Sequence, residues 1–282
     1  MSVAGMRVLV TGAARGIGAE LARQLAAAGA RVALVGLEPE ALAALATELG
    51  DEHWWAEADV RSQPDLEAAV AGAVERFGGL DVVVANAGVV NYGTVRDADP
   101  AEFARTIDIN LTGVFRTVHA ALPALVATRG YVLVLASIAS FTPLPGSASY
   151  AASKAGVDAL AATLALEVRH LGVAVGSAHP SWIDTDMVRR SERDLPSFRE
   201  MRARLRGPVG GTTTVAECAA ALVRGIEGRA RRIYVPRSGR LLRFVRGTGL
   251  PEVVERRAAR TLVPQMESEV AALRAEHRPT TH

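Results

Sequence analysis

Cysteine and lysine each occur only once in the 282 residues, as Cys218 and Lys154, and aromatic residues make up only 5%. A single cysteine excludes a disulfide framework within the chain and favours a reducing compartment, so we expect a cytoplasmic protein. Cys218 lies in an alanine-rich helical stretch with no adjacent histidine, and we interpret it as a core residue. The formal net charge of +2 excludes a global field that would attract nucleic acid.

Long hydrophobic runs are also missing. No run reaches the roughly eighteen apolar residues of a membrane span, because the alanine-rich segment 21–30 is broken by Arg23, Gln24 and Gly29. Residues 1–7 lack the charged and apolar regions of a signal peptide, so we expect none. What the chain does have is a high share of Ala, Val and Leu among its 49% hydrophobic residues. This composition is typical of helices packed on a parallel sheet.

Predicted strands and helices alternate along the first 235 residues. Short apolar runs predict strands, and longer periodic stretches predict helices. The predicted strands are residues 7–11, 31–35, 54–58, 81–85, 131–136, 173–178 and 232–235, and the predicted helices are residues 17–28, 39–49, 64–77, 101–128 with a break near Asp108, 150–170 and 215–225. The alternation predicts an α/β fold, a Rossmann-like doubly wound parallel sheet of about seven strands with helices on both faces. We expect one domain over residues 1–236, followed by a C-terminal extension over residues 237–282.

A glycine-rich turn joins the first predicted strand to the first helix. Its glycines let the backbone bend sharply and approach a pyrophosphate, and the helix N-terminus offers the anion free N–H groups and a positive dipole end. At this junction the turn indicates a dinucleotide-binding site, with a tight turn that binds no ligand as the alternative. The candidate cofactor-binding residues are Gly12, Ala14, Arg15, Gly16, Ile17 and Gly18.

The end of the second predicted strand bears on which cofactor binds. An acid there would bind the adenosine ribose and favour NAD, but this chain has Gly36. Arg15 in the turn can pair with a 2′-phosphate through two guanidinium nitrogens. These residues favour NADP(H). NAD(H) is the alternative, because Glu38 can reach a ribose and Arg15 can instead face solvent.

Polar residues also close the next two strands of the predicted sheet. Asp59-Val60 ends the third strand, and Asn86-Ala87-Gly88 ends the fourth. Ligands bind at the carboxyl ends of strands in open sheets, so we expect these residues to line the cofactor cleft. For Asp59, a helix cap or turn residue is the alternative interpretation.

The candidate catalytic residues follow the fifth predicted strand. Ser137 ends that strand, and Tyr150 and Lys154 are one helical turn apart, hence on one helix face. A phenol has an ordinary pKa of about 10, which a nearby ammonium lowers toward the working range of a general base. The Ser137 hydroxyl can hydrogen-bond a carbonyl or alcohol oxygen. By itself, a Tyr and Lys pair at this spacing occurs by chance on many helices.

Together these residues resemble the short-chain dehydrogenase/reductase family, in its single-domain branch of about 250 residues. The resemblance covers roughly residues 5–235. It implies an NAD(P)(H)-dependent oxidoreductase that interconverts a ketone and a secondary alcohol. A non-catalytic cofactor-sensing or membrane-associated binding protein on the same fold is the alternative. The matching pieces are Thr11-Gly12-x3-Gly16-x-Gly18, Asp59, Asn86-Ala87-Gly88, Asn110, Ser137 and Tyr150-x3-Lys154.

The resemblance also implies a role for each matching residue. Tyr150 would be the general acid in reduction and the base in oxidation, while Lys154 would bind the nicotinamide ribose and lower the Tyr150 pKa. Ser137 would hold the substrate oxygen, and Asn110 would anchor a water in the proton relay. Asp59 and Val60 would meet the adenine, and Asn86, with Ala87 and Gly88, would steady the central strand and the cofactor. No metal site is expected.

The segment after the sixth predicted strand departs from the family pattern. The family often has Pro-Gly there, whereas this chain has Pro180-Ser181. Pro180, Ile183 and Thr185 match the positions that contact the carboxamide of the cofactor. Residues 184–213 occupy the substrate-loop position, and we expect a mobile loop with one or two short helices. Apolar residues such as Trp182 and Met187 favour a hydrophobic substrate, with ordinary core or lid packing as the alternative.

Beyond residue 236 the chain continues past the usual end of the family. Four arginines interleave with apolar residues over residues 237–246. A basic amphipathic segment of this kind lies on an anionic membrane surface, or packs on the protein body with its arginines outward. The family resemblance further implies a homodimer or homotetramer formed through the helices that hold Asn110 and Tyr150.

Overall fold

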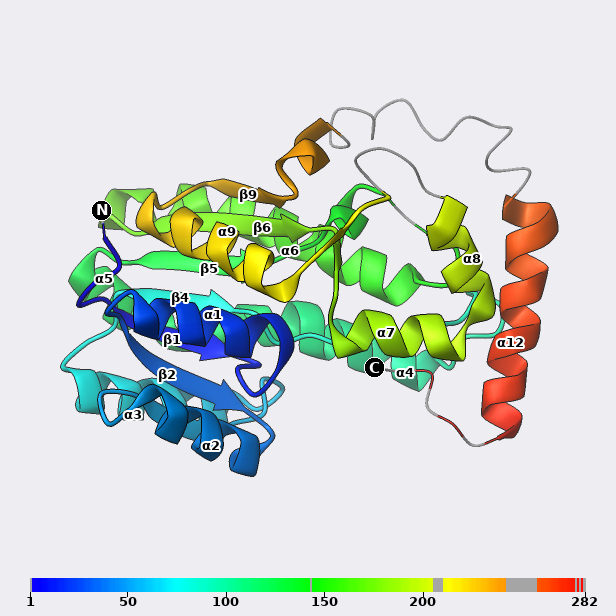
Figure 1. Ribbon diagram of the computed structural model, residues 1–282. Coiled ribbons are helices and arrows are strands. Elements are labelled where there is room, and N and C mark those ends of the chain that lie inside the picture. The colour runs from blue at the N-terminus through cyan, green and yellow to red at the C-terminus, as the bar shows by residue number, and fades with distance from the viewer. Residues whose placement is uncertain are drawn as a thin grey trace.

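The computed structural model describes residues 2–142, 144–204, 210–241, 258–276, 278 and 280 (Figure 1). Seven parallel strands form the main sheet in the order β3-β2-β1-β4-β5-β6-β9, which confirms the predicted fold class and strand number. The strands are β1 Arg7–Thr11, β2 Arg31–Gly36, β3 Trp54–Glu57, β4 Val82–Ala85, β5 Tyr131–Leu135, β6 Ala174–Pro180 and β9 Arg232–Val235.

The strand order reverses between β1 and β4, which lie side by side in the middle of the sheet. The chain moves outward from β1 through β2 to β3, then returns to β4 and moves outward the other way. At such a reversal the connections that leave the two strands diverge and open a crevice at their carboxyl ends. The glycine turn after β1 and the Asn86 segment after β4 both lie at this crevice.

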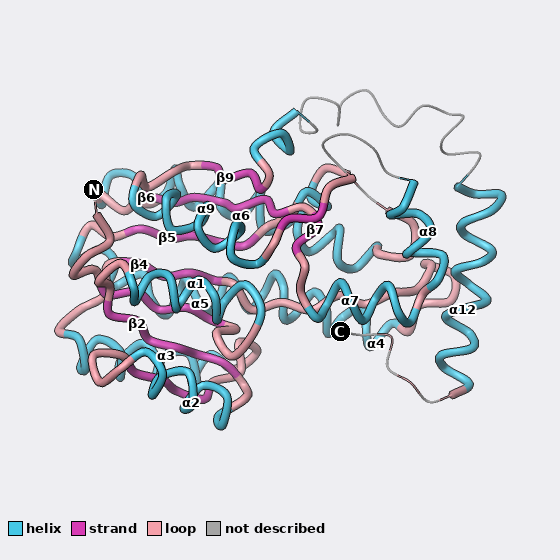
Figure 2. Tube along the Cα trace, viewed as in Figure 1, coloured by secondary structure: helices cyan, strands magenta, loops and turns pink. Residues whose placement is uncertain are grey.

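Helices cover both faces of the sheet (Figure 2). On one face, Leu21, Leu42 and Leu222 of three helices pack on the strands in one apolar cluster, which includes the fully buried Cys218. On the other face, Val118 and neighbouring residues form a second cluster. The helices of the first face are α1 Gly16–Ala27, α2 Pro39–Leu49 and α9 Val215–Glu227, and those of the second are α3 Gln63–Phe77, α5 Gly113–Thr128 and α6 Ala148–Glu167.

The predicted break near Asp108 is a π-helical turn, Asp108–Thr112, which joins α4 (Pro100–Ile107) to α5 without interrupting the helical run. By length and composition, the joined helix Pro100–Thr128 is the single candidate for a membrane span among the residues that the structure describes. A core helix of a globular domain passes the same test, and α5 contributes Val114, Val118 and Leu125 to the core beneath the sheet.

Two helices of nine residues each occupy the predicted substrate loop, α7 (Asp186–Asp194) and α8 (Pro196–Arg204). The short strands β7 (Trp182–Ile183) and β8 (Thr212–Thr213) pair with each other and form the base of this segment. The prediction of one or two short helices there is confirmed. The reason is local: the Thr185 hydroxyl accepts from the Val188 amide and caps α7, and Pro196 opens α8.

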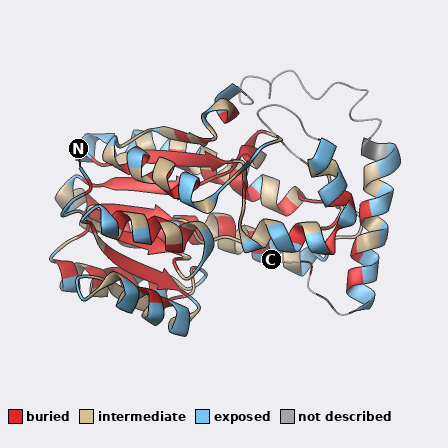
Figure 3. Ribbon diagram, viewed as in Figure 1, coloured by how far each residue is buried: buried red, intermediate tan, exposed pale blue. Residues whose placement is uncertain are grey.

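The C-terminal extension includes the helix α12 (Val263–Ala275), which lies beside α8 at the edge of the molecule (Figure 1). Met266, Val270 and Leu273 on its inner face are buried, while the rest of the helix is largely exposed (Figure 3). Of the basic segment 237–246, residues 237–241 begin with a 3-10 turn, Arg237–Gly239. Residues 242–257 lie outside the described residues, and so does most of the predicted amphipathic pattern.

Candidate active site

The glycine turn packs against the segment after β4 with no room for side chains. Gly12 and Gly16 have positive φ angles of 64° and 58°. A Cβ on Gly12 would lie 2.8 Å from Ala87 Cα, and one on Gly18 would lie 2.2 Å from the Gly12 oxygen. Glycine is therefore required by close approach as well as by backbone angle.

The N-terminus of α1 faces the same crevice. Its N-cap residue, Arg15, makes no side-chain cap hydrogen bond, so the first-turn N–H groups lack the usual partner. Ala14 and Ile17 pack against the core at this turn, which fixes the start of the helix. A diphosphate fits these residues, because the glycines admit it closely and the helix N-terminus supplies donors and a positive dipole end.

Asn86 ties the end of β4 to the glycine turn. Its Nδ2 donates to the Thr11 and Gly12 oxygens at 2.9 and 3.1 Å, and its amide N donates to Thr11 Oγ1 at 3.1 Å. Two residues later, a Cβ on Gly88 would lie 3.2 Å from Asn110 Oδ1 and 3.4 Å from Lys154 Nζ. Gly88 therefore lies where the cofactor crevice meets the candidate catalytic residues.

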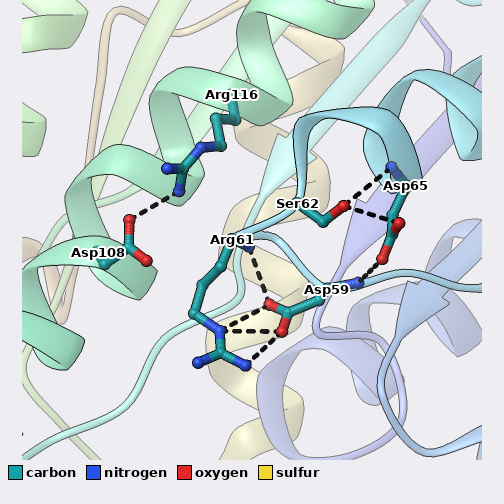
Figure 4. A network of polar contacts seen from close by, with 6 residues as sticks. All are labelled: Asp59, Arg61, Ser62, Asp65, Asp108 and Arg116. Carbon is teal, nitrogen blue, oxygen red and sulfur yellow. Dashed lines mark hydrogen bonds and ion pairs between the residues drawn. The ribbon is translucent and has the colours of Figure 1, made fainter.

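Asp59 stabilises its own turn at the end of β3. Its carboxylate pairs with Arg61 at 2.6 Å and also accepts from the Arg61 amide (Figure 4). The hydrogen bond from Arg61 holds the pKa of Asp59 below its ordinary value. Next to it, Val60 is buried, with its Cγ2 only 2.9 Å from the position of a Cβ on Gly113 of α5. The turn role that the sequence offered as an alternative for Asp59 is thus present in the structure.

Arg15 and Glu38, which were considered separately as determinants of cofactor choice, form an ion pair beyond the end of β2. Arg15 Nε lies 3.3 Å from Glu38 Oε1, and both side chains are about half exposed. The other Glu38 oxygen lies 3.6 Å from the position of a Cβ on Gly36. The Glu38 side chain therefore lies next to Gly36. A carboxylate is thus present at the end of β2, although the residue at that position is glycine.

Asn110 is buried in the π-helical turn and binds both backbone groups of Val89. Its Oδ1 accepts from the Val89 amide at 2.8 Å, and its Nδ2 donates to the Val89 oxygen at 2.8 Å and to Ser153 Oγ at 3.1 Å. Ser153 Oγ donates in turn to the backbone carbonyl oxygen of Tyr150 at 2.8 Å. A chain of hydrogen bonds thus runs from the segment after β4 to the helix that carries Tyr150.

Ser137, Tyr150 and Lys154 lie together at the carboxyl end of β5. Ser137 follows the strand, and its side chain interacts with Tyr150 in a way that favours the ionised phenol and so lowers the Tyr150 pKa. The Lys154 ammonium is buried, lies 5.7 Å from the centroid of the Tyr150 ring and donates to the Leu135 oxygen at 2.7 Å. The structure therefore brings the four candidate catalytic residues, Asn110 included, into one connected group.

Burial controls the protonation of this group. It raises the pKa of Tyr150, and the influence of the Ser137 side chain only partly offsets the shift. It also lowers the pKa of Lys154 to about 8. The net direction is opposite to the lowering that the sequence predicts, because loss of hydration disfavours the phenolate more strongly than Ser137 favours it. Tyr150 is therefore protonated near neutral pH and carries a proton that it can donate.

Comparison with known proteins decides the family. The model of the short chain dehydrogenase family matches residues 6–196. The chain belongs to the short-chain dehydrogenases. It is 40% identical over 210 residues to trans-4-hydroxycyclohexanecarboxylate dehydrogenase of Sinomonas cyclohexanicum, covering 70% of this chain and 81% of that one. It is 37% identical over 206 residues to a 3-alpha-(or 20-beta)-hydroxysteroid dehydrogenase of Mycobacterium tuberculosis strain H37Rv, covering 73% and 78%.

Solved structures give the same result for the fold. Levodione reductase superposes with a TM-score of 0.75 at 27% identity, over 82% of this chain and 96% of that one. The 3-ketoacyl-(acyl-carrier-protein) reductase from Brucella melitensis complexed with NADH also has a TM-score of 0.75, at 26% identity, over 83% and 98%. This short-chain dehydrogenase is thus an oxidoreductase that acts on CH–OH groups and binds a nucleotide cofactor.

The segment after β6 closes the crevice of this short-chain dehydrogenase from the other side. Pro180 ends β6, Ile183 is buried in β7, and Thr185 Cγ2 lies 3.8 Å from the position of a Cβ on Gly16. Ser181, which replaces the usual glycine, has a buried Oγ with no hydrogen-bond partner among the described residues. An unpaired buried hydroxyl at this place fits a crevice that receives a polar ligand.

His179 lies behind Ser137 and was not among the predicted site residues. The ring is fully buried, with Nδ1 3.3 Å from the backbone carbonyl oxygen of Ser137 and Nε2 3.0 Å from Ser177 Oγ. It stacks on Tyr234 with centroids 5.1 Å apart. The only signal in the sequence is a histidine just before Pro180, in a strand whose one other polar residue is Ser177. Because the Ser137 contact crosses from β6 to β5, only the tertiary structure shows it.

Proposed function

We propose that this short-chain dehydrogenase interconverts an apolar cyclic ketone and its secondary alcohol with NADP(H), using Tyr150 as the proton-transfer residue. The observation that carries the proposal is the connected group at the end of β5. Ser137 lies beside Tyr150 and influences its pKa, Lys154 lies one helical turn further on, and Asn110 reaches the same helix through Ser153. This arrangement accounts for Asn110, Ser137, Tyr150 and Lys154 together, which a non-catalytic binding protein would not need.

The cofactor supplies or accepts the hydride when it is bound, and the protein handles the proton. In reduction, the Tyr150 hydroxyl donates its proton to the carbonyl oxygen, and the Ser137 hydroxyl hydrogen-bonds the same oxygen as negative charge develops there. In oxidation, Tyr150 takes the proton back. Lys154 has two further N–H donors besides the one bound to the Leu135 oxygen, and these suit ribose hydroxyls.

The other cofactor contacts come from the crevice between β1 and β4. The diphosphate would lie on the glycine turn and the α1 N-terminus, the adenine beside Asp59 and Val60, and the carboxamide near the segment after β6. The proposed contacts are Gly12, Ala14, Arg15, Gly16, Ile17, Gly18, Gly36, Asp59, Val60, Asn86, Ala87, Gly88, Tyr150, Lys154, Pro180, Ile183 and Thr185.

The preference for NADP(H) is supported by Arg15 and Gly36. The ion pair of Arg15 with Glu38 is exposed and long, so it is worth less than about 1 kcal/mol. A 2′-phosphate carries more charge and can bind the guanidinium with two hydrogen bonds, so it displaces Glu38 at little cost. NAD(H) is the alternative that Glu38 supports, because its carboxylate lies at the end of β2. Titration of the nicotinamide fluorescence of NADPH and NADH separates the two, and tighter NADH binding would overturn the preference.

The substrate class is supported by the residues packed around Tyr150. Tyr150 and Trp182 lie against an apolar cluster that contains Val90, Tyr92 and Phe198. A cyclic hydrocarbon skeleton with one carbonyl suits such surroundings. Two relatives have names that specify a cyclohexane alcohol and a steroid alcohol.

Tyr150→Phe tests the mechanism. We expect it to retain NADPH binding and to lower kcat at least a thousandfold, because it removes only the acidic hydroxyl. Tyr131→Phe is the matched control, since Tyr131 is also buried but its hydroxyl binds the Ala230 oxygen away from the site. A screen of cyclic ketones and alcohols with both cofactors supplies the assay. Full turnover in the Tyr150 variant would refute the assignment.

Assembly and location follow from the same family. We propose a homodimer or homotetramer in the cytoplasm, formed through the α4–α5 helix and α6. Phe115 is half exposed on α5, and Leu166 is exposed on α6, which fits faces that a second copy covers. The single cysteine, Cys218, is buried and unpaired, which fits a reducing compartment. Sedimentation equilibrium measures the assembly, and a monomer at micromolar concentration would refute it.

A further inference from the structure

The inner face of α12 belongs to the same apolar cluster as Tyr150. Met266, Val270 and Leu273 are at most 5% exposed and follow each other at helical spacing. They pack with Val90 and Tyr92 after β4 and with Leu195 and Phe198 of the substrate loop, and Tyr150 packs against this cluster. The C-terminal helix is thus part of the surroundings of the active site in its own chain.

Two glutamates on α12 bind the segments on either side of the cluster. Glu267 accepts from Thr94 Oγ1 at 3.0 Å and pairs with Arg96 at 2.5 Å, both in the segment after β4. Glu269 accepts from Ser197 Oγ at 2.6 Å and from the Ser197 amide at 3.0 Å, at the start of α8. The helix is therefore held in one position relative to both segments.

The chain continues to hold this position after α12. Arg278 pairs with Asp194 of α7 at 2.5 Å, and the Tyr92 amide donates to the Thr280 oxygen at 3.0 Å. Arg274 also donates to the Asp97 oxygen. Polar contacts to both segments thus continue beyond the buried face of the helix.

Met266 of α12 reaches the segment that precedes Tyr150. Its Sδ lies 2.0 Å from the position that a Cβ on Gly146 would take, so only glycine leaves room for it. Gly146 has a φ of 73° and lies four residues before Tyr150, in the segment between Ser137 and the catalytic helix. The thioether therefore fills space directly beside the start of α6.

We propose that α12 forms a wall of the substrate site in its own chain, and that Met266 is a specificity-determining residue that limits the size of the ring bound beside Tyr150. This rests on the proposed function, in which Tyr150 receives an apolar ketone. A flexible, apolar thioether suits contact with a hydrocarbon ring. It also excludes a second fused ring from the space that it occupies.

The test compares a compact and a bulky ketone, cyclohexanone and 2-decalone, in the full-length chain. Met266→Ala should raise the ratio of kcat/KM for 2-decalone over cyclohexanone about tenfold, because the shortened side chain opens room for the second ring. Met266→Phe should lower the same ratio. Leu273→Ala is the matched control, since it lies in the same cluster on the same helix, and it should leave the ratio within about twofold of the parent.

Equal shifts in the Met266→Ala and Leu273→Ala variants would overturn the proposal, because loosening of the helix would then explain both. A ratio unchanged in Met266→Ala would also overturn it. If the parent turns over neither ketone, the proposed function fails, and the wall is tested by calorimetric binding of the two ketones to the enzyme–cofactor complex. If Met266→Ala increases the affinity for 2-decalone relative to cyclohexanone tenfold, the proposed wall is supported. An unchanged affinity ratio, or no binding of either ketone by any variant, refutes it.

Discussion

At the scale of single residues, Lys154 carries a buried charge that costs the protein stability. It is the only lysine in a chain with many arginines, and its ammonium is buried with the Leu135 oxygen as partner. An arginine fork is wider and its charge cannot be removed, so it does not replace a compact ammonium in a tight site. The burial that positions the ammonium also makes its charged form less stable, because the charge loses its hydration.

Lys154→Met is expected to raise the free energy of unfolding near pH 7 by about 2 kcal/mol and to abolish turnover. Burial lowers the Lys154 pKa from 10.5 to about 8, so between these values the folded state binds fewer protons than the unfolded state. The cost of the buried ammonium is therefore complete below about pH 8 and shrinks as the pH rises toward 10.5. Urea titrations near pH 7 and pH 10 should show the advantage of the variant shrinking, and a variant less stable at pH 7 would contradict this account.

The preference between NADPH and NADH is also expected to depend on single residues, Arg15 and Glu38. Glu38→Gln should shift the NADPH to NADH ratio of kcat/KM about tenfold toward NADPH, because it frees Arg15 and removes a carboxylate that repels phosphate. Arg15→Ala should shift the ratio the other way. Glu40→Gln, an exposed acid in the first turn of α2, is the control and should leave the ratio unchanged. Equal NADPH to NADH ratios of kcat/KM in all three variants would show that neither Arg15 nor Glu38 takes part in cofactor recognition.

At the scale of elements, the π-helical turn Asp108–Thr112 decides where Asn110 points. One wider turn inserted between α4 and α5 places the Asn110 amide against both backbone groups of Val89. π-helical turns of this kind occur frequently at functional sites. The turn therefore connects the crevice after β4 with the catalytic helix, while α5 still packs on the sheet.

Asn110→Ala should lower the free energy of unfolding by about 2–4 kcal/mol, because it leaves the N–H and the oxygen of Val89 without their partner. Thr106→Ala is the control on the same helical run. It removes one hydrogen bond to the Glu102 oxygen and should cost only about 1 kcal/mol. Chemical denaturation measures the free energy of unfolding of both variants. Equal losses would show that the Val89 contacts contribute no more stability than the single Thr106 hydrogen bond.

At the scale of the whole molecule, α12 connects parts of the chain that are distant in sequence. Its glutamates bind Thr94 and Arg96 on one side and Ser197 on the other, more than seventy residues away in each case. The segment after β4 and the start of α8 are therefore linked to each other through α12.

Glu269→Ala should loosen α8 without disturbing the cofactor crevice. We expect faster amide hydrogen exchange over residues 196–204, a higher KM for the ketone and an unchanged Kd for NADPH, because the Ser197 contacts are lost and the other lost bond, from Gln265, lies within α12 itself. Ser268→Ala, on the exposed face of the same helix, is the control. Unchanged exchange in α8 would show that the glutamate does not hold this helix.

Much of the fold was predictable, because local patterns encode it. The strand runs, the glycine turn and the Tyr150–Lys154 spacing are short-range features, and the order of strands and helices follows from them. Element ends shifted by one or a few residues, as at β3, and the break near Asp108 is a continuous π-helical turn. Those differences arise because capping and packing decide where an element ends.

The sequence by itself determined the family, the doubly wound sheet and the residue types of the candidate site, because glycine spacing and an i to i+4 pair are properties of neighbouring positions. Only the tertiary structure decided which distant residues meet. The Arg15–Glu38 pair, His179 behind Ser137 and Met266 against Gly146 each join positions far apart in the chain. Such contacts depend on how whole elements pack, and the burial that packing creates reversed the expected direction of the Tyr150 pKa.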